Sequence, residues 1–269
     1  MKYEPLNKQT HKGHSIRVNL TMEFCKNDTH CPIISDEVER AACEAPIVFL
    51  LNDRNNFDLC MLLGLQTGQN SFLNSSFKWT GNYIPALYRS YPFALLTEEN
   101  SKKKILCFDS ESNMIAPTDE EGAIPLFDKD GNHSDHLENI LKFVNALEAT
   151  RLSTTQAVKK IQQMELLEEW NLKVKRNDKT ETVKGLWKVN KEKFNGITND
   201  QFLELKDTGA VPIIYGHLSS LFALPRLAGN KEGTGVDSKK TLVDRTKEKQ
   251  AAASKKDVDN LVQNLLIDD

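Results

Sequence analysis

The first half of the chain, residues 1–130, alternates short apolar runs with polar segments. Residues 47–51 form one apolar run and residues 59–65 form a second, each ended by turn-forming residues. Runs of this length are typical of buried strands, and together they predict a hairpin around the polar residues between them. Residues 94–96 and 105–108 flank a charged loop in the same way and predict another pair of strands.

The apolar period changes at Asp135 to steps of three and four residues, which is the spacing of one helical face. The positions on this face are Leu137, Ile140, Leu141, Val144 and Leu147. Ser134 or Asp135 can cap this helix. The same spacing resumes over residues 158–166, after a Ser-Thr-Thr segment at 153–155 that is either a break or a weak turn.

A charged stretch, residues 168–184, separates this helix from the last apolar block of the chain. In that block we expect a short strand at 186–189. We also expect a helix at 200–206 and a second one at roughly 213–224.

The C-terminal segment has a different composition. Residues 228–256 are rich in Gly, Lys, Ser and Ala, and we expect disorder because they cannot offset their ordering entropy. Residues 257–267 then predict a short amphipathic helix. Its apolar stripe is Val258, Leu261, Val262, Leu265 and Leu266. Such a tethered helix can dock into a partner or fold back on its own domain, and amphipathicity alone does not decide between them.

These patterns predict an α+β fold. A β-rich N-terminal half of short, mostly antiparallel strands precedes a helical C-terminal half and a disordered C-terminal tail. We expect one domain over residues 1–227, strand-rich over 1–130 and mainly helical over 131–227. A disordered linker (228–256) and the short helix follow it.

Charge and hydropathy narrow the function classes. The chain has 269 residues, 35 of them basic and 38 acidic, so its formal net charge is −3 and gives no electrostatic reason to bind nucleic acid. Residues 1–14 are polar, without the apolar region of a secretory signal. The most apolar stretch, 210–225, is shorter than a membrane-spanning helix. We therefore expect a soluble, cytoplasmic protein with no membrane span.

Metal and catalytic motifs are scarce. The five cysteines are dispersed, and we expect reduced thiols. A possible zinc site is formed by Cys25, His30, Cys31 and Cys43. Because His30 and Cys31 are adjacent in the chain, they are poorly placed to bind one ion together, and we favour the interpretation that these are ordinary core or surface residues. The segment beginning at Asp128 resembles a calcium loop without its Gly and Glu, and better fits a tight turn. No hydrolase, metalloprotease or nucleotide-binding signature occurs, so we expect no metal, no cofactor and no assignable catalytic residue.

Aromatic residues gather between positions 72 and 93, with Arg89 among them. They are Phe72, Phe77, Trp79, Tyr83, Tyr88, Tyr91 and Phe93. Aromatics beside an arginine can form a recognition surface, for which the candidates are Asn70, Trp79, Tyr83, Arg89 and Tyr91. The favoured alternative is a core cluster in which Arg89 satisfies local carbonyl groups.

Two further candidates for binding, Tyr215 and His217, lie in the last apolar helix. They are two residues apart and therefore face different sides of the helix. A histidine in such a helix is more often a hydrogen-bonded core residue than a base. No nucleophile or orienting carboxylate can be assigned to His217.

Several motifs, in order along the chain, match one known family. They are Pro46-Ile47-Val48-Phe49, Leu62-Leu63-Gly64-Leu65 with Gln69-Asn70 and Phe72, Trp79, Tyr83-Ile84-Pro85-Ala86, Arg89-Ser90-Tyr91-Pro92-Phe93, Cys107-Phe108-Asp109, Gly185-Leu186-Trp187-Lys188-Val189, Phe202, Gly209 and Tyr215-Gly216-His217-Leu218-Ser219-Ser220-Leu221. Over about residues 1–227 the chain resembles the SapC family of bacterial proteins. Ser90 departs from the basic residue that the family usually has there, and the tail extends past the usual end.

The resemblance implies a soluble accessory or structural protein connected with the bacterial surface layer. It would bind a protein partner through the Arg89 region, the C-terminal helix or both. The family supplies no catalytic residues. The alternative is a small-ligand module or enzyme with a site near the Trp79, Arg89 and Tyr91 cluster. In it Arg89 would hold an anion, assisted by Tyr83, Tyr91 or His217. A pocket where Arg89 and His217 converge would favour it. A third hypothesis is a cytoplasmic chaperone for an exported surface protein.

Overall fold

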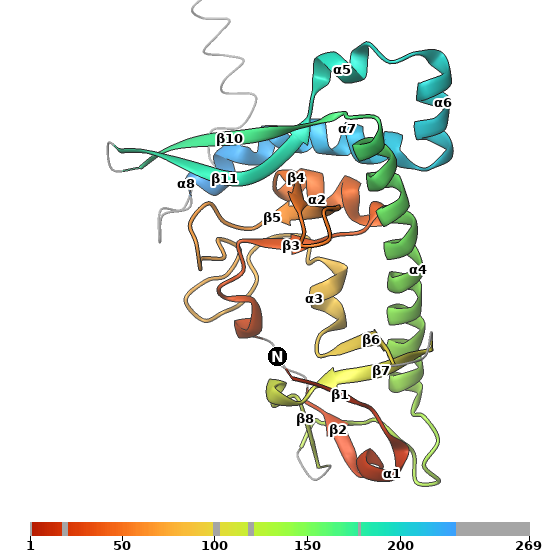
Figure 1. Ribbon diagram of the computed structural model, residues 1–269. Helices are drawn as coiled ribbons and strands as arrows, with labels where there is room; N and C mark the ends of the chain where they lie inside the picture. Colours follow the sequence, from red (N-terminus) through yellow and green to blue (C-terminus); the bar gives the residue numbers. More distant parts are fainter. Residues whose placement is uncertain (1, 18–20, 99–102, 118–120, 177–178, 230–269) are drawn as a thin grey trace, which may run out of the picture. The chain divides into compact units, whose positions relative to one another are not determined.

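The computed structural model describes residues 2–17, 21–98, 103–117, 121–176 and 179–229 (Figure 1). Antiparallel sheets come mainly from the N-terminal half and helices mainly from the C-terminal half, so the expected α+β class is confirmed. The predicted linker was wrong at residues 228–229, which are the last two residues of a helix that spans Leu224–Gly229. The rest of the linker and the predicted helix at 257–267 lie outside the described residues.

The largest sheet has five antiparallel strands in the order β10-β11-β4-β5-β3. These strands are β3 (His30–Pro32), β4 (Ile47–Leu51), β5 (Phe57–Leu62), β10 (Leu167–Arg176) and β11 (Lys179–Val189). β4 and β5 are the predicted hairpin, and their side chains are largely apolar because both strands lie inside the sheet. β3 ends in proline at a sheet edge, where a residue without an N–H group is tolerated.

Two small sheets of three strands complete the β structure. One has the order β1-β7-β6 and the other the order β8-β2-β9. Their strands are β1 (Tyr3–Pro5), β2 (His14–Ile16), β6 (Phe93–Thr97), β7 (Lys104–Asp109), β8 (Ile115–Pro117) and β9 (Ile124–Pro125). β6 and β7 are antiparallel and form the second predicted pair.

A single helix, α4 (Asp135–Gln163), runs for 29 residues. The Ser134 hydroxyl caps it by accepting a hydrogen bond of 3.2 Å from the Leu137 N–H, as predicted. Residues 153–155 do not break the helix. The Thr154 hydroxyl donates to the Thr150 carbonyl one turn earlier and accepts from the Ser35 N–H, so it is satisfied within the helical backbone.

The other helices are short. They are α1 (Lys8–His11), α2 (Val38–Glu44), α3 (Ala86–Ser90), α5 (Lys191–Asn195), α6 (Asn199–Asp207), α7 (Ala210–Ser220) and α8 (Leu224–Gly229). The 3₁₀ turns are η1 (Glu23–Cys25), η2 (Ser35–Glu37), η3 (Ser110–Ser112) and η4 (Leu221–Ala223). The predicted helices at 200–206 and 213–224 correspond to α6 and to α7 with η4.

The charged stretch 168–184 is not a connection but most of a long hairpin, β10–β11. The signal for this hairpin was alternation: Leu172 and Val174 are buried, whereas Asn171 and Lys173 are exposed. Gly185 provides a bulge in β11: two residues there face one in β10, and its φ of +81° favours glycine. The mainly helical half therefore also contributes the longest strands.

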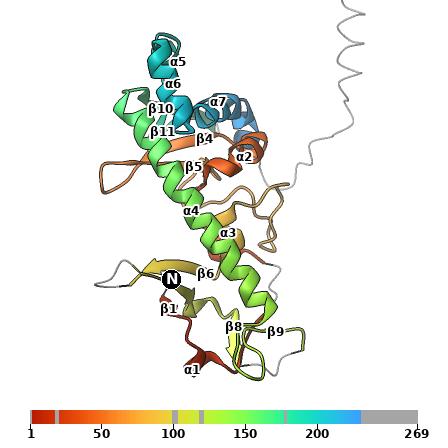
Figure 2. The ribbon, with the colours of Figure 1, turned by 90° about the vertical axis from the view of Figure 1, so that its right-hand side faces the viewer.

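Two hydrophobic clusters form the core. The larger packs the five-stranded sheet against α2, α7 and the second half of α4, where Val158 and Ile161 are buried. The smaller lies among β2, β6, β7 and the first half of α4, with Leu137 and Val144. Figures 1 and 2 show α4 running alongside both groups of strands, so one helix serves both clusters.

Candidate functional site

The aromatic residues between 72 and 91 form a packed cluster. Phe72 stacks on Trp79 with ring centroids 5.0 Å apart, and Trp79 meets Tyr88 edge-on at 6.0 Å. Phe24, which the sequence patterns did not include, stacks on Tyr91 at 3.9 Å. Phe72 and Tyr88 are buried. The cluster thus packs like part of a core, although Trp79 and Tyr91 are only half-buried.

Each tyrosine hydroxyl of this cluster donates to a carboxylate: Tyr83 to Glu37 at 2.6 Å, Tyr88 to Asp28 at 2.7 Å and Tyr91 to Asp109 at 2.9 Å. Burial is the main cause that raises the pKa of all three phenols, that of Tyr83 to about 12. The three hydroxyls therefore stay protonated at neutral pH and act as structural donors.

Glu37 is the centre of one such pairing and is only 3% exposed. One carboxylate oxygen accepts from the Tyr83 hydroxyl and, at 2.5 Å, from the Ala86 N–H at the start of α3. The other oxygen accepts from the Ile34 N–H at 3.0 Å. The hydrogen bonds of this buried carboxylate join η2 to α3, and they offset the cost of removing it from water.

Arg89 lies on the exposed side of α3. Its Nε donates to the Ile84 carbonyl at 3.1 Å, and its guanidinium lies over the rings of Phe143, at 5.1 Å, and Tyr83, at 5.9 Å. Asn70 is buried, and both ends of its amide bond to nearby backbone groups. Both residues make the local contacts that the core interpretation describes.

His217 is fully buried, with 0% exposure, and its ring bridges two strands. Nε2 accepts from the Val189 N–H at 3.0 Å, so Nδ1 carries the proton and donates to the Ile47 carbonyl at 2.7 Å. Burial lowers its pKa to about 4. Both ring nitrogens are occupied by backbone groups of β4 and β11, whereas Arg89 contacts Ile84, Tyr83 and Phe143.

Among the described residues, the most exposed aromatic side chains lie instead on α7 and η4, while Phe202 on α6 is less exposed, at 39%. Tyr215 is 52% exposed and Phe222 is 88% exposed. Seven residues, or two helical turns, separate them, so they project from the same side. The Tyr215 ring also contacts the buried Phe194 ring edge-on at 5.7 Å, which supports its position. We call this side of residues 215–222 the α7–η4 face.

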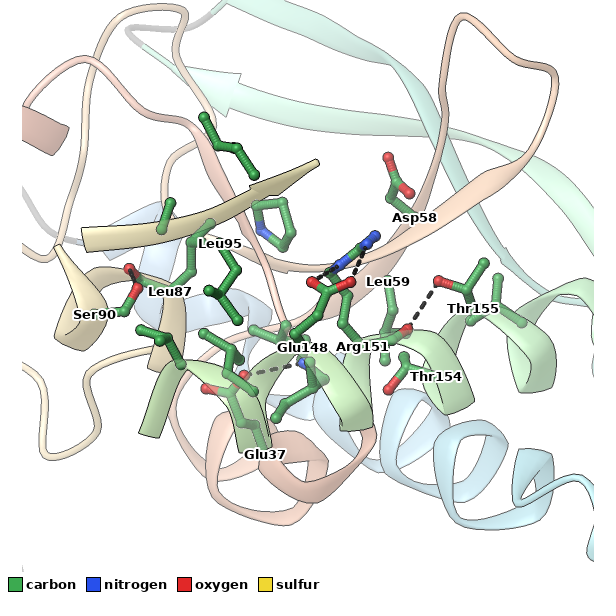
Figure 3. A pocket seen from close by; sticks show the side chains of 18 of the residues that line it. Glu37, Asp58, Leu59, Leu87, Ser90, Leu95, Glu148, Arg151, Thr154 and Thr155 are labelled. Atoms are coloured by element: carbon green, nitrogen blue, oxygen red, sulfur yellow. Dashed lines mark hydrogen bonds and ion pairs between the residues drawn. The ribbon is translucent and has the colours of Figure 1, made fainter. Parts of the chain in front are cut away.

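A cavity of about 600 Å³ lies beside α4, between β5 and β6 (Figure 3). It was not among the sequence predictions, because its walls come from segments far apart in the chain. Its apolar lining includes Ile33, Phe57, Leu59, Leu87, Leu95 and Val144. Leu87, on α3, and Leu96, on β6, are large apolar side chains of this lining that the fold leaves exposed.

An ion cluster lines one part of this cavity. The Glu148 carboxylate accepts two hydrogen bonds from the Arg151 guanidinium, at 2.8 and 2.7 Å, and also pairs with Lys104. The bonds from Arg151 are the main cause that lowers the pKa of Glu148 to about 2. Glu148 is therefore ionised at neutral pH.

Within the described residues, no three His, Cys, Asp or Glu side chains lie close enough to hold a metal ion. Cys25 and Cys31 are buried while Cys43 is exposed, which separates the members of the suspected zinc set. The Asp128 segment is a turn, in which the Asp128 carboxylate accepts from the Asn132 N–H at 2.7 Å. Across the described ranges, no helix has the length and apolar character needed to cross a bilayer.

The family model for SapC matches residues 6–227. No curated protein and no solved structure gives a match to this chain. The α+β domain described above is therefore an example of a known family, and the chain belongs to the SapC family.

Proposed function

We propose that this SapC-family protein is a non-catalytic accessory protein that binds another protein, and that its partner belongs to the bacterial surface layer. The observation that carries the binding role is the α7–η4 face, where Phe222 is almost fully exposed beside Tyr215. The surface-layer partner is the class that the family resemblance implies.

Exposed aromatic side chains on an ordered helix are suited to protein binding. They offer large, rigid contact area at little conformational cost, and such residues commonly dominate the free energy of binding at interfaces. Arg226, one turn beyond Phe222, is also exposed and donates to the Cys43 carbonyl at 2.6 Å. It would supply a polar rim to an aromatic centre, which is the usual anatomy of an interface.

The polar groups first considered for catalysis also favour a non-catalytic role. The hydroxyls of Tyr83 and Tyr91 are committed to carboxylates, and both His217 nitrogens are bonded to backbone. An enzyme centred on Trp79, Arg89 and Tyr91 would need these groups free for a substrate. The apolar stripe from Val258 to Leu266 lies outside the described residues, and its role in partner binding stays a prediction.

The test is affinity purification from the native cell, after cross-linking, with a Tyr215→Ser/Phe222→Ser double variant. Leu152→Ser is the matched control, because Leu152 is as exposed as Tyr215 but lies on α4. We expect the wild type and the control to recover the same surface-layer or exported protein, and the double variant to lose it. Thermal unfolding should be alike in all three proteins. Equal recovery by the double variant, or recovery of no such protein by the wild type, would overturn the proposal.

A chain ending at residue 229 separates the contribution of the C-terminal segment. If the apolar stripe also binds the partner, this shorter chain should recover less of it while its α7–η4 face is intact. The same recovery with and without residues 230–269 would contradict a role for the stripe.

A further inference from the structure

The cavity beside α4 has the size and position of a ligand site. Its volume of about 600 Å³ is within the range of roughly 300–1,000 Å³ that small-molecule sites show. It lies between the two hydrophobic clusters, since Phe57 belongs to the larger and Val144 to the smaller. It shares no residue with the α7–η4 face.

One part of the cavity is apolar. Leu87 and Leu96 both line it, and both are among the large apolar side chains that the fold leaves exposed. In Figure 3, Leu87 and Leu95 lie on one side of the cavity, away from Asp58 and Arg151. Apolar surface that is open to water inside a concave site gains free energy when a ligand covers it.

The other part is charged. Arg54, Lys104 and Arg151 line it, with the carboxylates of Asp58 and Glu148. Glu37 also lines the cavity, so three cations face three carboxylates. The Glu37 oxygens accept hydrogen bonds from Tyr83 and from backbone N–H groups.

Arg54 is the cation best able to meet a ligand. It lies on the turn between β4 and β5, and within the described part of the chain its guanidinium has no hydrogen-bond or ion-pair partner. Arg151 and Lys104 are held in place by Glu148. A planar guanidinium matches a carboxylate by two parallel hydrogen bonds.

We propose that this cavity binds a linear fatty carboxylate, with the chain along Leu87, Leu95 and Leu96 and the head at Arg54. Arg54 is the cation whose guanidinium has no partner among the described residues, and one such group suits a single carboxylate head. A phosphate dianion would leave negative charge unbalanced beside Asp58 and Glu148, and a cationic head would meet Arg54 and Lys104 directly.

The test measures binding to the full chain by calorimetry, below the concentration at which the ligands aggregate. The probes are octanoate, decanoate, dodecanoate and tetradecanoate, with dodecanol and dodecyltrimethylammonium as the neutral and cationic analogues. Each added methylene should tighten Kd by up to about fourfold until the cavity is full. Dodecanoate should bind tighter than either analogue. Absence of binding by every carboxylate, or equal binding of the three dodecyl ligands, would overturn the proposal.

Variants locate the site. Arg54→Ala should weaken dodecanoate about three- to tenfold and leave dodecanol unchanged, because only the charged head is lost. Its matched control is Arg40→Ala, an exposed arginine on α2 outside the cavity. Leu96→Asp should weaken both ligands, whereas Leu203→Asp, at an exposed leucine on α6, should weaken neither. All four positions are exposed, so each variant should fold. Binding that is unchanged in both Arg54→Ala and Leu96→Asp would exclude this cavity.

Discussion

The His217 ring replaces part of a β-sheet ladder, and this gives a sharp prediction. β4 and β11 pair at Leu50 with Leu186 and at Phe49 with Trp187. Continued by two residues, the register would pair Ile47 with Val189. The ring of His217 lies between these two instead, donating to the Ile47 carbonyl and accepting from the Val189 N–H. α7 thus completes the sheet through a side chain.

Replacing His217 with leucine should be strongly destabilising. The change keeps most of the volume but leaves the Ile47 carbonyl and the Val189 N–H without partners in a fully buried position. Each unsatisfied buried group costs about 1–3 kcal/mol, so we expect a loss of roughly 3–5 kcal/mol in the free energy of unfolding at pH 7. His217→Gln offers one donor and one acceptor on a similar length and should recover part of this loss.

The same residue should make stability depend on pH. Its pKa is about 4 in the folded protein, mainly because of burial, against an ordinary value of 6.5. The unfolded chain therefore binds a proton at this residue between these values while the folded chain does not, and stability falls as pH falls from 6.5 toward 4. Between pH 7 and pH 5 this contribution amounts to about 2 kcal/mol.

Urea denaturation at pH 7 and pH 5 measures both effects. The wild type should lose about 2 kcal/mol more than His217→Leu between the two pH values, because the variant has no such group to titrate. His30→Gln, at an exposed histidine, is the control and should follow the wild type. A variant that loses less than about 1 kcal/mol at pH 7, or that shows the pH dependence of the wild type, would refute the reasoning.

Three further changes should be measurable by thermal or urea unfolding. A Cβ on Gly216 would come within 2.0 Å of a Val38 methyl, so Gly216→Ala should push α7 from α2 and cost about 1–3 kcal/mol. In Gly185→Val the new Cβ would contact no other atoms, but a branched residue would have to adopt a φ of +81°. We expect a loss of about 1–2 kcal/mol in the free energy of unfolding. A loss below roughly 0.5 kcal/mol would argue against the bulge. Glu148→Gln should lower the free energy of unfolding by only about 1–2 kcal/mol at pH 7, because the ion pair with Arg151 is partly exposed to water. Since the pKa of Glu148 is lowered to about 2, the wild type should lose this contribution as pH falls from about 4.5 to 2, and the variant should not.

Local pattern was enough to predict many elements. The apolar runs ended by turn residues gave the β4–β5 and β6–β7 hairpins, and the three- and four-residue spacing with Ser134 gave the start of α4. Their cause is local, since periodicity and capping act within a few residues. The β10–β11 hairpin was missed because its charged outward side chains dominate the composition and conceal the alternation of Leu172 and Val174.

The motif around His217 shows what sequence alone left undetermined. Its position in an apolar helix indicated a core residue, but its partners lie 170 and 28 residues away and could not be read from spacing. The cavity is similar: Arg54, Leu96 and Glu148 come from a turn, a strand and a helix that only the tertiary packing brings together. Sequence determines which segments fold and which faces are apolar, because those properties are local. The joining of distant backbone groups and the space left between two cores depend on long-range packing, and only the tertiary structure decided them.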